Sequence, residues 1–160
     1  MNKQFNDALI KVPQLTIGFW IIKILATTLG ETGGDAVSMS MNLGYLVGTV
    51  IFMSFFIAAV IMQVKSTKFS PFIYWITIIA STTVGTTLAD FADRSLGIGY
   101  LGGSTLLATL LIITLAIWYR TIGSISVSSI DNPKAESFYW LTIMFSQTLG
   151  TALGDWTADT

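Results

Sequence analysis

Apolar runs of the length needed to cross a lipid bilayer are the feature that most limits how this chain can fold. A helix needs about 20 mainly apolar residues to cross the hydrocarbon core. A first run, 15–35, is interrupted by Lys23 and Glu31, and four later runs contain no charged residue: 43–64, 70–89, 98–119 and 137–154. Only helices and closed barrels satisfy their backbone in lipid, and strand-like alternation is absent. We therefore predict an all-α, polytopic membrane helix bundle with five transmembrane helices.

The composition supports this class of protein and excludes several others. Of the 160 residues, 52% are hydrophobic and 11% are charged, and this charged fraction is about half that of an average soluble domain. The net charge of −1 offers no basic surface to a nucleic acid, so we expect no such partner. Without cysteine or histidine, the chain has no disulfide, no thiolate metal site and no imidazole base. We expect a protein of the lipid bilayer that is not an enzyme.

Positively charged residues predict the orientation of the spans. Arg94 is the only loop cation on one side, whereas six lysines and arginines fall on the other: Lys3, Lys11, Lys65, Lys68, Arg120 and Lys134. The positive-inside rule then places the N-terminus in the cytoplasm and the C-terminal end outside. The first fourteen residues lack the apolar core of a cleaved signal peptide, and we interpret them as a short cytoplasmic lead-in.

A repeated phrase ends the first, third and fifth predicted helices. The segments TTLGETGGD, TTVGTTLAD and QTLGTALGD align at Gly30, Gly85 and Gly150, with tryptophan ten residues before each glycine and aspartate five residues after it. The second and fourth helices repeat as well, since LGYLVGT matches IGYLGGS at the same 55-residue offset. We predict one membrane domain, 1–160, built from parallel helix hairpins: repeat one at 15–64, repeat two at 70–120 and a partial repeat three at 137–160.

These hairpins, in which tryptophan is followed by Thr-x-Gly-x-x-x-x-Asp, resemble bacterial multi-pass membrane proteins catalogued as a repeat of unknown function. The resemblance covers nearly all of 19–159. It implies a location in the bacterial inner membrane, and it implies no substrate. Members of this group usually carry four copies, whereas this sequence holds two and a half. We therefore expect a homo-oligomer, or further repeats, to close the bundle.

Oxygen-bearing side chains line one face of the first, third and fifth helices, because residues three and four apart are neighbours on a helix. Carboxylates at the ends of these lines are the predicted cation ligands: Glu31, Asp35, Asp90 and Asp155. Hydroxyls below them are the predicted secondary ligands: Thr28, Thr83, Thr86, Thr148 and Thr151. Asp93 and Asp159 follow just beyond, and we expect them to form an outer acidic rim.

Carboxylates at helix C-termini face the negative end of the helix dipole and also repel one another. A positive group should compensate them, and the candidates are a bound cation, protons, or the N-terminal ends of the second and fourth helices. Carboxylate and hydroxyl oxygens suit hard cations such as magnesium, calcium, manganese or sodium. The alternative is that each aspartate is an ordinary interfacial residue at a helix end. Beyond a bound cation, no cofactor is predicted.

Two further features of these helices concern buried charge and packing. Lys23 lies two turns inside the first span, where the other copies have Ile78 and Ile143. It is either a gating or counter-ion group, or a side chain whose ammonium extends to the cytoplasmic interface. Small residues recur every four positions and predict close helix packing. The glycines of these ridges are Gly30, Gly34, Gly85, Gly150 and Gly154.

Three functions are compatible with the sequence. The leading hypothesis is a membrane protein that binds and transports or conducts a small hard cation, such as manganese, magnesium, sodium or protons. The second hypothesis is a membrane packing or assembly subunit without transport. The third, an intramembrane aspartyl hydrolase, is disfavoured because the aspartates lie near the outer interface and not at depth.

Overall fold

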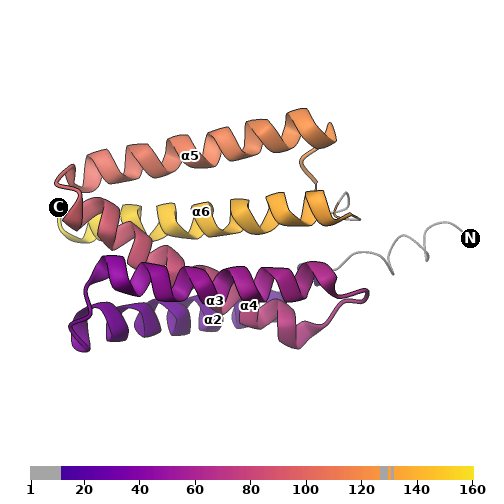
Figure 1. Cartoon of the computed structure of the whole chain (residues 1–160), viewed down its shortest axis with the longest axis horizontal. Helices are drawn as coiled ribbons and strands as arrows, with labels where there is room; N and C mark the ends of the chain where they lie inside the picture. Colours follow the sequence, from indigo (N-terminus) through magenta and orange to yellow (C-terminus); the bar gives the residue numbers. More distant parts are fainter. Residues whose placement is uncertain (1–11, 127–129, 131) are drawn as a thin grey trace, which may run out of the picture.

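The described part of the chain is a bundle of five α-helices (Figure 1). The computed structural model describes residues 12–126, 130 and 132–160, and these residues contain no strand. The helices are α2 (Ile17–Asp35), α3 (Tyr45–Lys65), α4 (Pro71–Asp90), α5 (Gly99–Ile122) and α6 (Pro133–Ala158). Two π-helical turns extend α2 and α4: η1 (Ala36–Ser40) and η2 (Phe91–Ser95). The predicted all-α fold class is confirmed.

Local sequence signals set where these helices begin. Thr16 caps α2 by accepting a hydrogen bond from the backbone N of Phe19 at 3.2 Å, and the Asn132 side chain caps α6 through Ala135 N at 2.9 Å. Proline occupies the first turn of α4 and of α6, where its missing N–H costs nothing. The chain reverses direction between successive helices, so α2, α4 and α6 run parallel to one another and antiparallel to α3 and α5 (Figure 1).

Helix α4 forms the centre of the bundle. It packs against α2, α3 and α6, while α5 packs on α6 and on η2. Most of the apolar window of α4 is buried, whereas the corresponding windows of α3 and α5 are mostly exposed. The central position of α4 explains why polar residues concentrate on it, because its side chains face other helices and not the surroundings.

The outer surface of the bundle is compatible with a membrane. Three helical segments are long and apolar enough to span one, namely α3, α4 with η2, and α5. On α2, more than half of the surface of Ile21, Ile24 and Leu25 is exposed, as expected of side chains that face lipid. Helices α2 and α6 carry more polar residues and remain predicted spans. Lys3 and Lys11, which contribute to the predicted orientation, lie outside the described residues.

Hydroxyl side chains on α4 are mostly satisfied within the helix itself. Thr77 donates to the carbonyl oxygen of Ile73 at 2.8 Å, and Thr83 donates to that of Ile79 at 2.9 Å. Such bonds to the preceding turn allow threonine to sit in an apolar environment. Thr86 is different: its hydroxyl is buried without a hydrogen-bond partner, and the residue is only 2% exposed.

Glycines bring α2, α4 and α6 into close contact. A Cβ atom on Gly30 would lie 2.8 Å from Thr82 Cβ, and one on Gly34 would lie 3.3 Å from the carbonyl oxygen of Thr83. In the same way, a Cβ on Gly85 of α4 would lie 3.1 Å from the backbone N of Thr148 on α6. These three glycines therefore pack as small-residue ridges do in lipid.

The glycine ridge of α6 does not follow this pattern within the described chain, and the packing predicted for Gly150 and Gly154 stays a prediction. A Cβ on either residue would have nothing within 4 Å. The reason is the order of the helices. Helix α2 packs on α4 and α4 packs on α6, but no described helix packs on the face of α6 that carries Gly150 and Gly154. Both glycines border an open cleft instead.

An aromatic layer closes the end of the bundle where α2, α4 and α6 begin. The hydroxyls of Tyr74 and Tyr139 lie 2.9 Å apart in a hydrogen bond between α4 and α6, and both side chains are buried. Trp140 packs against Tyr74 with ring centroids 5.4 Å apart, and Phe19 of α2 belongs to the same apolar cluster. Polar side chains at the other end are thus separated from this end by a packed core.

Candidate functional site

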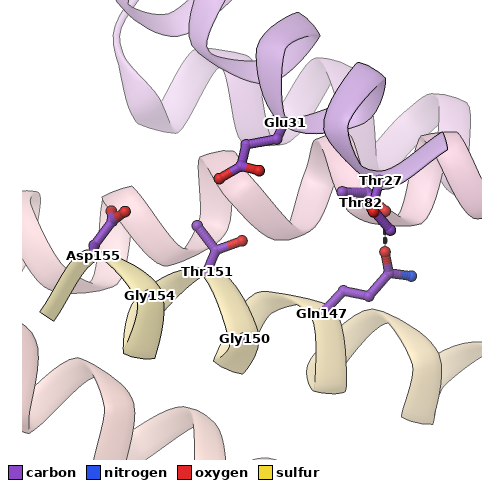
Figure 2. A pocket seen from close by; sticks show the side chains of 8 residues that line it. All are labelled: Thr27, Glu31, Thr82, Gln147, Gly150, Thr151, Gly154 and Asp155. Atoms are coloured by element: carbon purple, nitrogen blue, oxygen red, sulfur yellow. Dashed lines mark hydrogen bonds between the residues drawn. The ribbon is translucent and has the colours of Figure 1, made fainter. Parts of the chain in front are cut away.

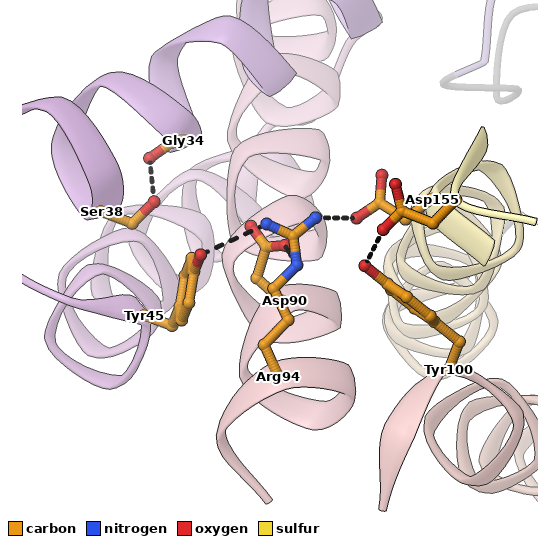
Figure 3. Close-up of polar contacts among 8 residues, drawn as sticks. Gly34, Ser38, Tyr45, Asp90, Arg94, Tyr100 and Asp155 are labelled. Carbon is orange, nitrogen blue, oxygen red and sulfur yellow. Dashed lines mark hydrogen bonds and ion pairs between the residues drawn. The ribbon is translucent and has the colours of Figure 1, made fainter. Parts of the chain in front are cut away.

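Arg94 lies at the centre of the polar end of the bundle (Figure 3). It stands on η2, one turn beyond Asp90, and its Nε lies 3.3 Å from Asp90 Oδ1. Its Nη2 donates to Asp155 Oδ2 on α6 at 3.0 Å, and its Nη1 donates to the Tyr45 hydroxyl on α3 at 3.3 Å. One guanidinium therefore joins α3, α4 and α6.

This position corrects the expectation that Arg94 is a loop residue, because it stands in a π-helical turn. The π-helical turn continues α4 beyond Asp90 and directs the guanidinium back over the bundle, so an internal cation compensates two of the predicted ligands. A signal for the contact was present in the sequence, because Asp90 and Arg94 are four residues apart and such pairs meet on a helix. The position of Asp155 on the opposite side of the guanidinium depends on tertiary packing.

A small acidic cavity of about 100 Å³ opens beside this ion pair. Carboxylates from three helices line it: Glu31 and Asp35 from α2, Asp90 from α4 and Asp155 from α6. Asp90 is 2% exposed, whereas Glu31 is exposed. Arg94 pairs with Asp90 and Asp155, and in the described part of the chain Glu31 and Asp35 form no ion pair. The four predicted ligands thus share one cavity that carries a net negative charge.

The carboxylates line this cavity without forming a chelate. In the described residues, no group of three or more Asp, Glu, His or Cys side chains is arranged to hold a single metal ion. Arg94 occupies the space between Asp90 and Asp155 in this arrangement. A cation that bound to all four carboxylates would therefore have to displace the guanidinium.

A larger cleft of about 440 Å³ continues from the acidic cavity toward the middle of the bundle (Figure 2). The two spaces share Glu31, Thr151 and Asp155. Gln147 lies at the deep end, where its Nε2 donates to Ser81 Oγ at 2.7 Å and its Oε1 accepts a hydrogen bond from Thr82. Sequence analysis did not select Gln147, although it stands where the other two copies have threonine.

The predicted threonine ligands divide into three groups. Thr86 and Thr151 line the acidic cavity. Thr83 and Thr148 are buried at helix contacts, and each donates to a carbonyl oxygen of its own helix, so they do not face the cavity. Thr28 is exposed on α2 and lines neither space. The spacing of three and four residues identified the correct helices, but the exact face depends on how each helix is rotated.

The predicted outer rim is also divided. Asp159 is exposed and accepts a hydrogen bond from the Tyr100 hydroxyl. Asp93 is not at the rim, because it is 5% exposed and its carboxylate lies against Gly103 of α5. The wider π-helical turn changes the direction of the side chains that follow Asp90, and this turn was not predicted.

Lys23 is half-buried on α2, one helical turn before Thr27 of the cleft. Its Nζ is enclosed and forms no hydrogen bond in the described structure, so the ammonium does not extend into the surroundings. Lys23, Thr27 and Glu31 are four residues apart and share one face of α2, and the latter two line the cleft. The ammonium thus lies one helical turn closer to the aromatic layer than the deepest cleft residue of α2.

Comparison with known proteins identifies the repeat. The family described as Repeat of Unknown Function (DUF347) matches residues 18–69 and 73–124, which correspond to the hairpins α2–α3 and α4–α5. Partial repeat three lies outside these matches and remains a prediction. No curated protein and no solved structure matched the chain. Because the two matches together cover more than half of the sequence, the chain belongs to the DUF347 repeat family, as the resemblance predicted.

Proposed function

We propose that this membrane-compatible bundle binds and transports or conducts a small hard cation through the acidic cavity between α2, α4 and α6. The observation that carries the proposal is the shared cavity itself, which four carboxylates from three parallel helices line. The buried, unpartnered hydroxyl of Thr86 gives independent support, because an orphaned polar atom in a cavity wall indicates a missing partner. Oxygen ligands of this kind favour manganese, magnesium, sodium or protons.

Arg94 acts in this proposal as a resident counter-ion. It balances one of the four negative charges around the cavity and keeps the carboxylates together when no cation is bound. An incoming cation competes with the guanidinium for Asp90 and Asp155, and Glu31 and Asp35 supply the remaining negative charge. Exchange between a mobile and a tethered cation makes binding reversible, which transport requires.

The path of the cation would run from the acidic cavity into the larger cleft and stop at Gln147. The hydrogen bonds from Gln147 to α4 and the aromatic layer beyond it close the inner end. Lys23, as the proposed gate, adds a positive charge just below that closure. We further propose that the acidic end faces the outside of a bacterial inner membrane, that the N-terminus is cytoplasmic, and that the protein has no catalytic activity.

Cation flux into proteoliposomes tests this function. Purified full-length chain is reconstituted, and uptake is followed with Mn²⁺, Mg²⁺, Na⁺ or a proton gradient as the probe. The triple variant Asp35→Asn, Asp90→Asn and Asp155→Asn should lose uptake of the transported ion. Asp159→Asn, which removes a carboxylate outside both spaces, should retain it. Unchanged flux in the triple variant would rule out these carboxylates as ligands.

The open glycine ridge of α6 supports a second candidate function, assembly without transport. Helix α4 covers the ridge glycines of α2, and α6 covers Gly85 of α4, whereas a Cβ on Gly150 or Gly154 would have no described atom within 4 Å. Thr28 of α2 is exposed at the position that corresponds to Thr148, against which Gly85 packs. A second copy of the chain would bring its α2 against the free ridge of α6 and repeat this contact.

Disulfide cross-linking tests the assembly in a chain that contains no native cysteine. The variant Thr28→Cys with Gly150→Cys should form covalent dimers in the bilayer. The pair Thr28→Cys with Thr121→Cys, in which the second cysteine is exposed on α5, is the control and should remain monomeric. Equal yields from the two pairs would exclude the proposed contact.

A further inference from the structure

Three buried oxygen atoms without hydrogen-bond partners belong to η2 and α5, two elements that pack against each other. Both carboxylate oxygens of Asp93 are buried and form no hydrogen bond, and the residue is 5% exposed. Ser104 is 4% exposed, and its Oγ is also buried without a partner. Gly103, which precedes Ser104 on α5, has the Asp93 carboxylate where its Cβ would be. The absence of a side chain on Gly103 thus creates the space that the carboxylate fills.

Repeat one shows that the fold does not need a carboxylate at this contact. At the 55-residue offset, Asp93, Gly103 and Ser104 correspond to Ser38, Gly48 and Thr49. Ser38 donates to the carbonyl oxygen of Gly34 at 2.9 Å, and Thr49 donates to that of Tyr45 at 2.7 Å. A Cβ on Gly48 would lie 3.5 Å from Ser38 Cβ, so the same elements pack in the same way. Every hydroxyl of that contact is satisfied.

Asp93 forms no ion pair in the described residues. Arg94 follows it in the sequence but is engaged by Asp90, Asp155 and Tyr45. A buried carboxylate without a counter-ion is strongly destabilising. An orphaned carboxylate of this kind, with an orphaned hydroxyl on the helix packed against its turn, points to a group that the protein itself does not provide.

We propose that Asp93 and Ser104 bind a monovalent metal cation, with sodium as its physiological form, at a site between η2 and α5. A single carboxylate balances a single positive charge, whereas a divalent ion would leave an uncompensated positive charge in a buried position. The donors are carboxylate and hydroxyl oxygens, which are hard ligands. The site is separate from the acidic cavity, because neither residue lines it. The proposal therefore does not depend on the proposed transport function.

The bound ion would have a structural consequence for Arg94. Asp93 and Arg94 are neighbours on η2, and fixing Asp93 against α5 fixes the turn that presents the guanidinium to Asp90 and Asp155. In repeat one, Met39 occupies the position of Arg94, and no ion pair depends on that turn. The cation site and the ion pair thus occur together in repeat two.

Thermal unfolding of the full chain in detergent tests the site. The unfolding midpoint is measured against NaCl at constant ionic strength, with choline chloride as the replacement salt, and in parallel with MgCl₂. The midpoint of the wild type should rise with sodium and then saturate, because an ion that binds only the folded state stabilises it. Asp93→Asn, which keeps the shape of the side chain, should abolish this shift. Ser104→Ala should raise the half-saturating sodium concentration several-fold.

Two variants provide the controls. Asp159→Asn removes an exposed carboxylate at the same end of the bundle and should keep the full sodium-dependent shift. Asp93→Ser copies repeat one and should unfold at a midpoint that is independent of sodium. The proposal is overturned if the wild type does not respond to sodium, or if Asp93→Asn keeps the response. It is also overturned if magnesium, and not sodium, gives the shift that depends on Asp93.

Discussion

The two π-helical turns in the described part of the chain have the same backbone conformation but carry side chains of different chemistry. Turn η1 follows α2 and turn η2 follows α4, each is five residues long, and each leads to a helix that packs through a glycine. In η1 the inward residue is Ser38, which is satisfied by its own helix. In η2 it is Asp93, which is not. The packing of such a turn therefore accommodates a neutral residue at this position and does not itself require the carboxylate of Asp93.

The two turns also differ in charge at the residue that follows Ser38 in η1 and Asp93 in η2. Met39 in η1 is apolar and cannot form an ion pair, whereas Arg94 in η2 forms ion pairs with both Asp90 and Asp155. Repeat two thus supplies both the cation that balances the acidic cavity and the buried carboxylate behind it. The first hairpin has no charged residue in its π-helical turn and contributes Glu31 and Asp35 of α2 to the cavity wall.

The largest effect is expected when Arg94 is replaced by the residue of repeat one. Arg94→Met leaves Asp90 buried without a counter-ion, and removing one member of a buried pair costs about 3–5 kcal/mol. We expect a loss of about 3 kcal/mol in the free energy of unfolding, because the Arg94 side chain is about one-third exposed. Denaturant titration in mixed micelles measures this value.

Two further variants show whether the loss arises from the ion pair. Arg94→Met combined with Asp90→Asn should recover most of the lost stability, since the carboxylate that needed a counter-ion is then neutral. Met39→Leu, the matched change in η1, should cost less than about 1.5 kcal/mol, as volume-conserving apolar substitutions do. Equal losses for Arg94→Met and Met39→Leu would show that the two turns are energetically alike.

A smaller effect on stability is expected at Gly48 and Gly103, the glycines that pack against η1 and η2. Gly103→Ala places a methyl group where the Asp93 carboxylate lies, and overpacking of this kind costs about 1–3 kcal/mol. Gly48→Ala meets only ordinary contacts, the nearest being Thr87 at 3.4 Å, and alanine is favoured over glycine in a helix by about 1 kcal/mol. We therefore expect Gly103→Ala to destabilise the protein and Gly48→Ala to be neutral or stabilising in the same unfolding assay.

A second substitution shows whether the destabilisation by Gly103→Ala arises from the Asp93 carboxylate or from a backbone contact of the glycine. Asp93→Ser in the Gly103→Ala background gives repeat two the same serine and alanine that Gly48→Ala would give repeat one, and it should remove most of the penalty. If Gly103→Ala remains equally destabilising after Asp93→Ser, then the glycine serves a backbone contact and not the carboxylate.

The sequence predicted features that depend on period and repetition. Runs of about 20 apolar residues gave the five helices, and the alignment of Gly30, Gly85 and Gly150 identified which helices carry equivalent faces. The convergence of acids on one cavity also follows from this alignment, because equivalent residues on parallel helices lie at the same height. These features require only that each helix keep its 3.6-residue period.

Features that depend on rotation and on irregular backbone were not predicted. A straight extension of α4 gave no reason to place Asp93 against α5, since the π-helical turn changes the direction of its side chain. Thr28 and Thr148 occupy equivalent positions, yet one is exposed and the other buried, because α2 and α6 have different neighbours. The open ridge at Gly150 has the same cause. Position within the bundle, and not the local motif, decides these cases.

The smallest effect on stability is expected one and two turns before Asp90, where the hydroxyls of Thr86 and Thr83 provide a matched pair on one helix. Thr83→Val removes a hydrogen bond to the Ile79 carbonyl and should cost about 0.5–1.5 kcal/mol. Thr86→Val removes a hydroxyl that has no partner, so it should leave stability unchanged or raise it slightly. Unfolding titrations of both variants measure the difference.

The two variants should have the opposite order in transport. Thr86 lines the acidic cavity and Thr83 does not, so Thr86→Val should lower cation uptake in proteoliposomes, whereas Thr83→Val should leave it near the wild-type rate. A hydroxyl kept at a cost to stability is then explained by a cation that it contacts. If Thr86→Val transports normally and is also no more stable than the wild type, its hydroxyl has a partner within the protein, and the independent support that Thr86 gives to the cavity is lost.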